Sequence, residues 1–190
     1  MTPDRNRVVI TGMGAITPLG QTPDAFWANL LAGKPGIGPM TLCDATDYPC
    51  RIAGEVRDFD PTQYIDGKEA RRMARFSQLA VAAGLTAVES AGLDISQEDP
   101  YRVGVVLGNG NGGFPTLEDN CRVLAEKGGM RMTPFFFPMV LPNMAAANLS
   151  RYVGAHGYNS TATTACAASN QAIGQALDVI RRGSADVVLA

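Results

Sequence analysis

Cys166 is the residue in this chain best placed to do chemistry. It lies between a Thr/Ala-rich extended run, 160–165, and a run of helical character, 167–182, so we expect its thiol at a strand-to-helix turn. A sulfur at a helix N-terminus meets unpaired backbone N–H groups and the positive end of the helix dipole, which stabilise a thiolate. The segment therefore indicates a nucleophile. Taken alone it is also compatible with a structural cysteine, because free cysteines are often buried.

Strand and helix patterns alternate along the chain and predict an α/β protein. We expect strands at 7–11, 51–56, 102–107 and 184–190. The run at 102–107 is continuously apolar, which is typical of a strand buried in a parallel sheet. Helices are expected at 23–32, 68–91, 115–127, 138–152 and 167–182. Small residues share one face of the helix at 68–91, which should therefore pack closely against a neighbour.

Composition limits the function classes. The net charge of −2 provides no general attraction for nucleic acid. The four cysteines, at 43, 50, 121 and 166, form neither CxxC pairs nor a disulfide framework, so we expect a reducing compartment, the cytoplasm, and no metal site. No apolar stretch approaches about 18 residues, so no membrane span is predicted. The start, MTPDRNR, runs into the first expected strand and leaves no room for a signal peptide.

Four blocks of sequence, in this order, carry a family resemblance. They read VVITGMGAITPLG at 8–20, RRMARFSQLAVAA at 71–83, RVGVVLGNGNGG at 102–113 and TTACAAS at 163–169. Together they resemble the N-terminal half of a β-ketoacyl-acyl-carrier-protein synthase, closest to the elongating type II enzymes. The resemblance implies a thiolase-like fold, in which two similar α/β halves form a five-layered sandwich. Residues 1–190 would be one N-terminal half, and the terminal DVVLA strand suggests that the C-terminal half is absent.

The resemblance also implies an activity. Members of this family transfer an acyl group from acyl-carrier protein to a cysteine, here Cys166, and then condense it with malonyl-carrier protein by decarboxylative Claisen chemistry in fatty acid elongation. No cofactor is implied. The family uses two histidines for the decarboxylation, and His156, the only histidine of the chain, matches neither. We therefore expect the chain by itself to be inactive.

The loop after the third expected strand contains a literal GxGxxG at Gly108, Gly110 and Gly113. This spacing is typical of dinucleotide-binding proteins, but no strand with a terminal acid follows it at about 20 residues. The resemblance implies instead that the loop borders the acyl pocket. Asn111 stands there where the family leads us to expect an apolar residue. A glycine turn needed only for close backbone packing remains an alternative.

Two further surfaces have a local and a family interpretation. Lys68, Arg71, Arg72 and Arg75 are spaced as one basic helical stripe. The stripe could be an ordinary solvated face, but the resemblance implies that Lys68, Arg71 and Arg72 dock the acidic carrier protein.

The segment PFFFPMVLP at 134–142 is an apolar loop that could simply fill the core. The resemblance places Phe136 and Val140 at a homodimer interface, where they line the partner's acyl channel. The strand at 158–165 is then a candidate to pair across the two-fold axis.

Three alternatives to a fatty acid synthase remain at this point. A polyketide ketosynthase domain shares the nucleophile block. A non-catalytic scaffold or chain-length partner of a synthase is disfavoured by the presence of Cys166. A Rossmann-type oxidoreductase would bind NAD(P), which makes nucleotide binding the discriminating test.

Overall fold

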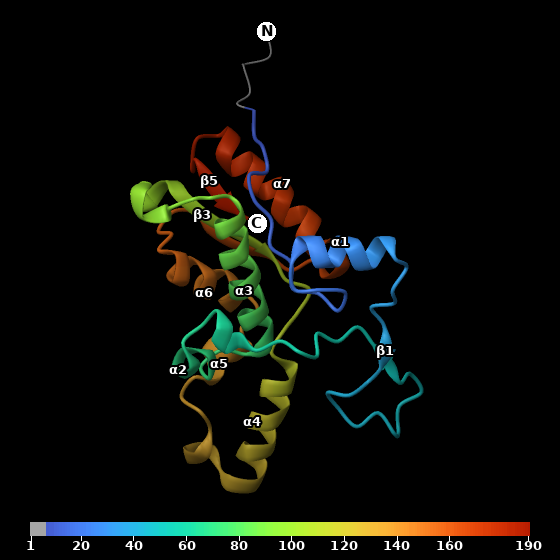
Figure 1. The fold of residues 1–190 in the computed structure, drawn as a ribbon. Helices are drawn as coiled ribbons and strands as arrows, with labels where there is room; N and C mark the ends of the chain where they lie inside the picture. Colours follow the sequence, from blue (N-terminus) through green and yellow to red (C-terminus); the bar gives the residue numbers. More distant parts are fainter. Residues whose placement is uncertain (1–6) are drawn as a thin grey trace.

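The sheet at the centre of the molecule is parallel. The computed structural model describes residues 7–190, with strand order β4-β3-β5 and helices on both sides of the sheet (Figure 1). β3 (Val103–Gly108) is the middle strand, flanked by β4 (Asn159–Ala162) and β5 (Val187–Leu189). The predicted α/β class and its central apolar strand are thus confirmed. Residues 1–6 of the expected 1–190 domain lie outside the described part.

The core forms where helices cover β3. Val103, Val105 and Val106 are at most 1% exposed, as expected for a strand buried on both faces. α3 (Arg75–Ser90) packs against α6 (Met144–Val153) on one side of the sheet, and α7 (Ala168–Arg181) covers the other. A Cβ on Gly84 would lie only 2.4 Å from Leu149 Cδ1. The small-residue face therefore brings α3 and α6 together, as the sequence predicts.

Shorter elements connect these layers. α1 (Pro23–Leu31) begins where Thr22 Oγ1 accepts the Ala25 N–H, which is an N-cap contact. The remaining elements are β1 (Gly38–Pro39), β2 (Ile52–Ala53), α2 (Gly67–Ala70), α4 (Phe114–Lys127), α5 (Phe136–Val140) and the 3-10 turns Pro61–Gln63, Ile95–Gln97, Pro100–Arg102, Gly129–Arg131 and Ala165–Ala167. No helix within residues 7–190 is long and apolar enough to cross a membrane.

The single long helix expected at 68–91 is wrong, because the chain breaks at 71–74 between α2 and α3. The Asp66 carboxylate caps α2 by accepting the N–H groups of Lys68 and Glu69. Beyond α2, Gln78 Nε2 donates to the carbonyls of Ala70 and Met73. Capped at the start and satisfied at the end, the short helix needs no continuation into α3.

The helix expected at 138–152 is also divided. α5 ends at Val140 and α6 begins at Met144, and Leu141 between them has extended backbone at φ −70° and ψ 130°. Pro142 explains this break, since a proline disfavours the helical conformation of the residue before it and lacks an N–H. The same region shows that 134–142, expected to be an apolar loop, is partly helical.

The strand expected at 7–11 is wrong as well. Residues 7–16 form no described strand, and the side chains of Val9 and Ile10 are 58% and 79% exposed. The following backbone lies against α3 instead. A Cβ on Gly12 would be 2.4 Å from Ala87 O, and one on Gly14 would be 1.9 Å from Ala83 O. Glycine at these two positions lets the chain follow a helix rather than join the sheet.

The Glu55 carboxylate joins two parts of the irregular segment between α1 and α2. Glu55 accepts the N–H groups of Thr41 and Leu42 and the Thr41 hydroxyl, and Arg57 Nε lies 3.3 Å from Glu55 Oε2. These hydrogen bonds, led by the Thr41 N–H, lower the pKa of Glu55 from its usual 4.5 to about 2. The Glu55 side chain is only 7% exposed, so the clamp is sheltered although the segment around it is open to solvent.

We predict that acid opens this segment through Glu55. A carboxyl whose pKa is lowered on folding stabilises the fold above its usual pKa and loses that effect as the pH falls through the lowered value. The Thr41 and Leu42 amide NMR signals should therefore titrate with a midpoint near 2 rather than 4.5. At neutral pH, Glu55→Gln should speed hydrogen exchange at both amides, whereas the exposed control Glu98→Gln should not. A midpoint near 4.5 would contradict the clamp.

Candidate active site

Cys166 lies at the turn that the sequence predicts. β4 ends at Ala162, the 3-10 turn Ala165–Ala167 follows, and α7 begins at Ala168. The Cys166 side chain is exposed, so a buried structural cysteine is wrong. Ala165, directly before it, has φ +50°, and within residues 7–190 it is the non-glycine residue with positive φ. Such left-handed alanine backbone is strained, and strain of this kind gathers at functional sites.

The position of the turn follows from a close approach of backbones. A Cβ on Gly108, at the end of β3, would lie 2.3 Å from the carbonyl carbon of Ala168 and 2.4 Å from the Ser169 nitrogen. Only glycine lets the first turn of α7 rest on the strand end at this distance. Across the turn, Thr164 Oγ1 donates to Gln171 Oε1 at 2.8 Å, which ties the strand side to the helix.

The backbone N–H groups near Cys166 differ in whether they already donate a hydrogen bond within the protein. The Ala167 N–H donates to Thr164 O, and the Ala168 N–H donates to Ala165 O. For the Cys166 N–H, no acceptor is described within residues 7–190. This amide, at the positive end of α7, is therefore free to donate to an oxygen that becomes negative near the sulfur.

The glycine loop 109–113 joins this turn to α3 and α5. Towards the cysteine turn, a Cβ on Gly110 would be 3.8 Å from Ala165 O. Towards α3, a Cβ on Gly112 would lie 2.4 Å from Cγ of the Phe76 ring. Towards α5, a Cβ on Gly113 would lie 2.9 Å from Val140 Cα. Asn109 Nδ2 also donates to Pro142 O at 2.8 Å. The loop thus lies between the cysteine turn and the segment that carries Phe136 and Val140.

The three expected pocket residues are brought only partly together. Phe136 and Val140 are half-buried in α5, while Asn111 is exposed on the glycine loop. The Asn111 Oδ1 accepts the N–H of Gly112 at 2.9 Å, so its carbonyl oxygen already has a partner. A polar amide at this position is therefore less costly than the sequence alone suggests.

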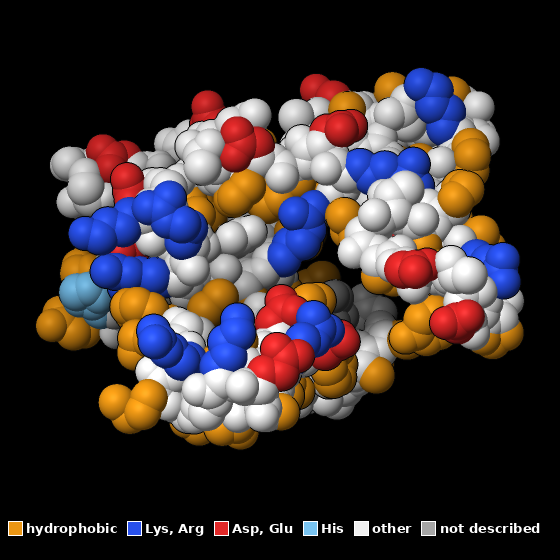
Figure 2. Space-filling view, turned by 90° about the horizontal axis from the view of Figure 1, so that it is seen from below, with side chains coloured by type: hydrophobic (Ala, Val, Ile, Leu, Met, Phe, Trp, Pro, Cys, Tyr) orange, Lys and Arg blue, Asp and Glu red, His pale blue; other side chains and the backbone are white. Residues whose placement is uncertain are grey.

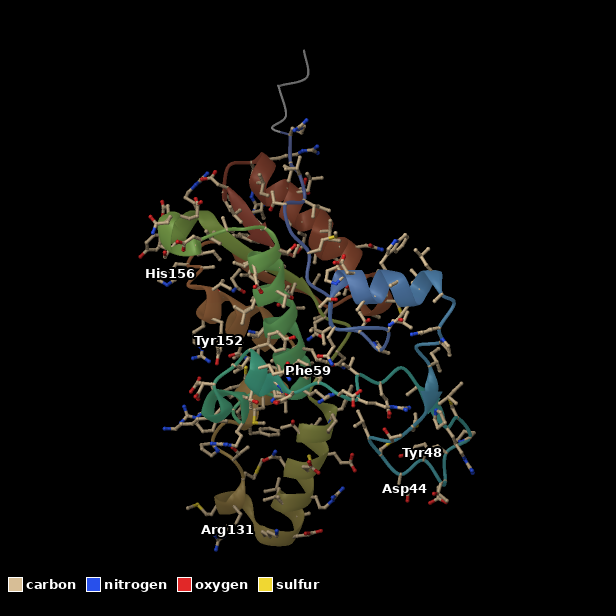
Figure 3. All side chains as sticks on the ribbon, viewed as in Figure 1. Asp44, Tyr48, Phe59, Arg131, Tyr152 and His156 are labelled. Carbon is tan, nitrogen blue, oxygen red and sulfur yellow. The ribbon has the colours of Figure 1, made fainter. Side chains whose placement is uncertain are left out.

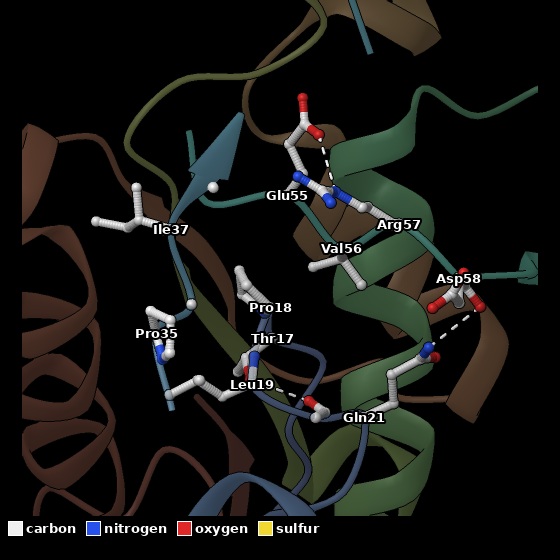
Figure 4. A pocket seen from close by; sticks show the side chains of 13 residues that line it. Thr17, Pro18, Leu19, Gln21, Pro35, Ile37, Glu55, Val56, Arg57 and Asp58 are labelled. Atoms are coloured by element: carbon white, nitrogen blue, oxygen red, sulfur yellow. Dashed lines mark hydrogen bonds and ion pairs between the residues drawn. The ribbon is translucent and has the colours of Figure 1, made fainter. Parts of the chain in front are cut away.

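Two cavities are described, and neither is lined by Cys166, Asn111, Phe136 or Val140. The larger, of about 360 Å³, lies between the segments 17–21, 35–38 and 55–58 (Figure 4). The smaller, of about 160 Å³, lies beside Gly108 and Ser169, behind the cysteine turn. The expected acyl pocket is not enclosed by these residues.

His156 lies away from the cysteine. His156, labelled in Figure 3, precedes β4 and therefore lies at the amino end of the sheet. Cys166 follows β4 and lies at the carboxyl end. The backbone N–H of His156 donates to Pro100 O at 2.7 Å. The imidazole ring meets the Tyr101 ring edge-on, with 5.6 Å between the ring centroids. This agrees with a turn role. Within residues 7–190, no group of three His, Cys, Asp or Glu side chains is placed to hold a metal ion.

The expected basic stripe does not lie on one helix, because Lys68 is in α2, Arg71 and Arg72 are in the break at 71–74, and Arg75 begins α3. Lys68 and Arg71 are exposed. Arg72 is paired with Glu69, and Arg75 lies over the Phe59 ring and donates to Val56 O. In the view from below, Lys and Arg side chains lie on the left, the side of α2, and also at the centre and right of the face, so they form no single patch (Figure 2).

Several residues that shape the site escape sequence reasoning. Gly108 was visible only as part of a glycine pattern, and its contact with Ala168 spans 60 positions. The strain at Ala165 has no signal in residue type, since alanine usually avoids positive φ. Asn109 was also missed, and so was the contact of Glu69 with Arg151. An asparagine beside two glycines was the one available hint for Asn109.

The fold and site define a class, an α/β protein of thiolase-like fold with an exposed cysteine between a central-sheet strand and a helix. Comparison with known proteins agrees. The family model for the β-ketoacyl synthase N-terminal domain matches residues 5–190. The chain is 45% identical over 186 residues to 3-oxoacyl-acyl-carrier-protein synthase 2 of Synechocystis, covering 98% of this chain and 45% of that protein. The chain therefore belongs to the β-ketoacyl synthase family.

Solved structures give the same class. The ishigamide ketosynthase/chain length factor matches 97% of this chain and 46% of its own with TM-score 0.86 and 31% identity. A type II PKS ketosynthase, solved with its acyl-carrier protein, matches 95% of this chain and 48% of its own with TM-score 0.79 and 29% identity. The chain spans about half the length of the relatives that it matches. Family membership makes the Rossmann-type oxidoreductase wrong.

We predict that Gly108→Ala disturbs the site. Its Cβ would meet backbone atoms of Ala168 at 2.3 and 2.4 Å, so α7 has to move. Overpacking of this kind costs about 1–3 kcal/mol, and at this size each kcal/mol lowers Tm by about 2–4 °C. Gly174→Ala in α7 is the control, because nothing lies within 4 Å of its Cβ and alanine favours helix. Thermal unfolding measures both, and an unchanged Tm for Gly108→Ala would contradict the close approach.

Proposed function

We propose that this chain supplies the nucleophile of a 3-oxoacyl-acyl-carrier-protein synthase that elongates fatty acids. The observation that carries the proposal is the exposed Cys166 at the N-terminus of α7, in a chain 45% identical to a synthase of that name. The proposed catalytic residue is Cys166. The proposed acyl-pocket residues are Asn111 of the glycine loop and Phe136 and Val140 of α5, the helix whose Val140 lies beside Gly113.

In the first proposed step, the Cys166 thiolate attacks the thioester carbonyl of an acyl-carrier protein. A new bond forms between Sγ and the acyl carbon, and the carrier leaves as its thiolate. The negative oxygen of the tetrahedral intermediate accepts the Cys166 N–H, the amide without a described acceptor. Removing one such donor in an oxyanion hole typically slows a reaction by about 10²–10³.

In the second proposed step, malonyl-carrier protein loses CO2, and the carbanion left behind attacks the acyl-cysteine. A carbon–carbon bond forms and Cys166 leaves as the thiolate, so the enzyme is restored. Stabilising the enolate charge needs donors that this chain does not bring near Cys166, because its one histidine lies at the opposite end of the sheet. We infer that the chain alone is inactive and that residues 1–190 act as the N-terminal half of a larger enzyme.

Acyl-carrier protein is the proposed partner. A relative of similar fold was solved as a ketosynthase with its acyl-carrier protein, which supports the proposal. Exposed Lys68 and Arg71, together with Arg72, are the proposed docking cations for this acidic protein.

We also propose a homodimer and a cytoplasmic location. β4 is an edge strand of the described sheet, so its outer edge can pair with that of a second copy. The four cysteines are all exposed free thiols, which a reducing compartment preserves.

A polyketide ketosynthase is the second candidate, because both structural relatives named above come from ketosynthases and one of them acts in a type II PKS. Their identities of 31% and 29% are lower than the 45% shared with the fatty acid type enzyme. A scaffold or chain-length partner is disfavoured because Cys166 is present and exposed. Product analysis distinguishes them, since a fatty acid enzyme adds one two-carbon unit to a reduced acyl chain.

We predict that Cys166→Ala abolishes acylation of the complete synthase. Intact-protein mass spectrometry after incubation with carrier protein loaded with an acyl group should show one added acyl group in the unaltered enzyme and none in the variant. The control Cys121→Ala should still be acylated. An acyl group that persists in Cys166→Ala, on Cys43, Cys50 or Cys121, would overturn the assignment.

We predict that Lys68→Glu combined with Arg71→Glu weakens carrier docking. KM for the carrier-bound substrate should rise roughly tenfold, which corresponds to about 1.4 kcal/mol, while acylation by a small carrier-free thioester stays nearly unchanged. Added salt should also raise KM for the carrier-bound substrate in the unaltered enzyme, because the Debye length falls from about 10 Å at 0.1 M to about 3 Å at 1 M. Equal losses with both substrates would mean that these charges serve folding.

A further inference from the structure

The three cations assigned to docking are not equivalent. Lys68 and Arg71 are exposed, and no ion pair is described for either within residues 7–190. Arg72 is half-buried, and its Nη1 lies 2.9 Å from Glu69 Oε1. The Arg72 guanidinium carbon also lies 4.8 Å from the centroid of the Phe135 ring. Arg72 therefore makes the internal contacts that the other two cations lack.

Glu69 fixes the guanidinium of Arg72 in place. While Oε1 binds Arg72, Oε2 accepts from Arg151 Nη2 of α6 at 2.8 Å. The Glu69 side chain is 28% exposed, less than the 40% of Arg72 and the 56% of Arg151. A carboxylate held by two arginines cannot follow a rotating partner freely, so the planar group of Arg72 stays over the aromatic ring.

Phe135 connects Arg72 to the glycine loop through α5. It is the N-cap residue of α5, and its carbonyl accepts the Met139 N–H at 3.0 Å. At the other end of α5, Val140 Cα is the atom that a Cβ on Gly113 would approach to 2.9 Å. A continuous set of contacts thus runs from α2 through Arg72, Phe135 and α5 to the loop beside the cysteine turn.

We propose that Arg72 is a positioning residue that holds α5 against the glycine loop, and that only Lys68 and Arg71 bind the carrier directly. The inference rests on the proposed function and refines it. Because α5 carries Phe136 and Val140, Arg72 influences which acyl chains fit beside Cys166. Docking and chain selection are then served by neighbouring residues of one short segment.

Lysine substitutions separate the two roles. Arg72→Lys keeps the charge but loses the planar group that stacks on Phe135, whereas the matched control Arg71→Lys keeps all that a docking cation needs. With carrier-free acyl thioesters and the complete synthase, Arg72→Lys should change the ratio of kcat/KM between long and short acyl chains by roughly threefold or more. Arg71→Lys should leave that ratio unchanged. Arg71→Ala should raise KM for the carrier-bound substrate more than Arg72→Ala does.

A second measurement needs no catalytic activity. Hydrogen exchange at the Met139 and Leu141 amides, which bond to Phe135 and Phe137 within α5, should speed up in Arg72→Lys and in Phe135→Leu. The double variant should show no more than the larger single effect, because both changes break one contact.

Opposite results have distinct meanings. Unaltered chain preference and unaltered exchange in Arg72→Lys would overturn the positioning role, as would a carrier KM equally raised by Arg72→Ala and Arg71→Ala. If the unaltered synthase is never acylated at Cys166, the proposed function fails instead, while the exchange experiment still decides whether Arg72 holds α5.

Discussion

The contact between the end of β3 and the first turn of α7 controls the geometry of the whole site. Because Gly108 has no side chain, Ala168 rests on the strand end, and the chain has only residues 163–167 in which to turn from β4 into the helix. That short connection places Ala165 at φ +50°, which costs about 1–3 kcal/mol. Burial of Ala168, Ala172, Ala176 and Val179 against the sheet opposes this cost. The exposed thiol is a consequence of tight packing beneath it.

The glycine loop is likewise held by close contacts on its glycines more than by side-chain hydrogen bonds. Phe76 of α3 fills the space over Gly112, and Val140 of α5 does so at Gly113. The position of the loop therefore depends on the positions of α3 and α5. The position of α3 depends in turn on the close contact of its Gly84 with Leu149 of α6. The literal GxGxxG pattern reflects this packing, which was the local alternative to nucleotide binding.

Sequence reasoning succeeds here where the signal is local and fails where it depends on distant partners. The apolar run at β3 and the strand-to-helix turn at Cys166 are local patterns, and both are confirmed. The breaks at 71–74 and 141–143 were missed because helical periodicity continues across them, although Pro142 marked the second. The contact of Glu69 with Arg151 joins residues 82 positions apart, and neither charge periodicity nor residue type indicates it.

The sheet topology places Cys166 and His156 at opposite ends of the parallel strands. In a parallel sheet the carboxyl ends of all strands lie at one edge, which is where ligands of such folds bind. Cys166 and the glycine loop are at that edge, whereas His156 is at the other, so no rotation of its side chain brings it to the sulfur. Of the groups that the proposed acyl transfer requires, this turn carries the Cys166 thiol and one amide donor. The proposed enolate stabilisation needs donors beyond those that the described residues bring near Cys166, and the relatives that the chain matches are about twice its length.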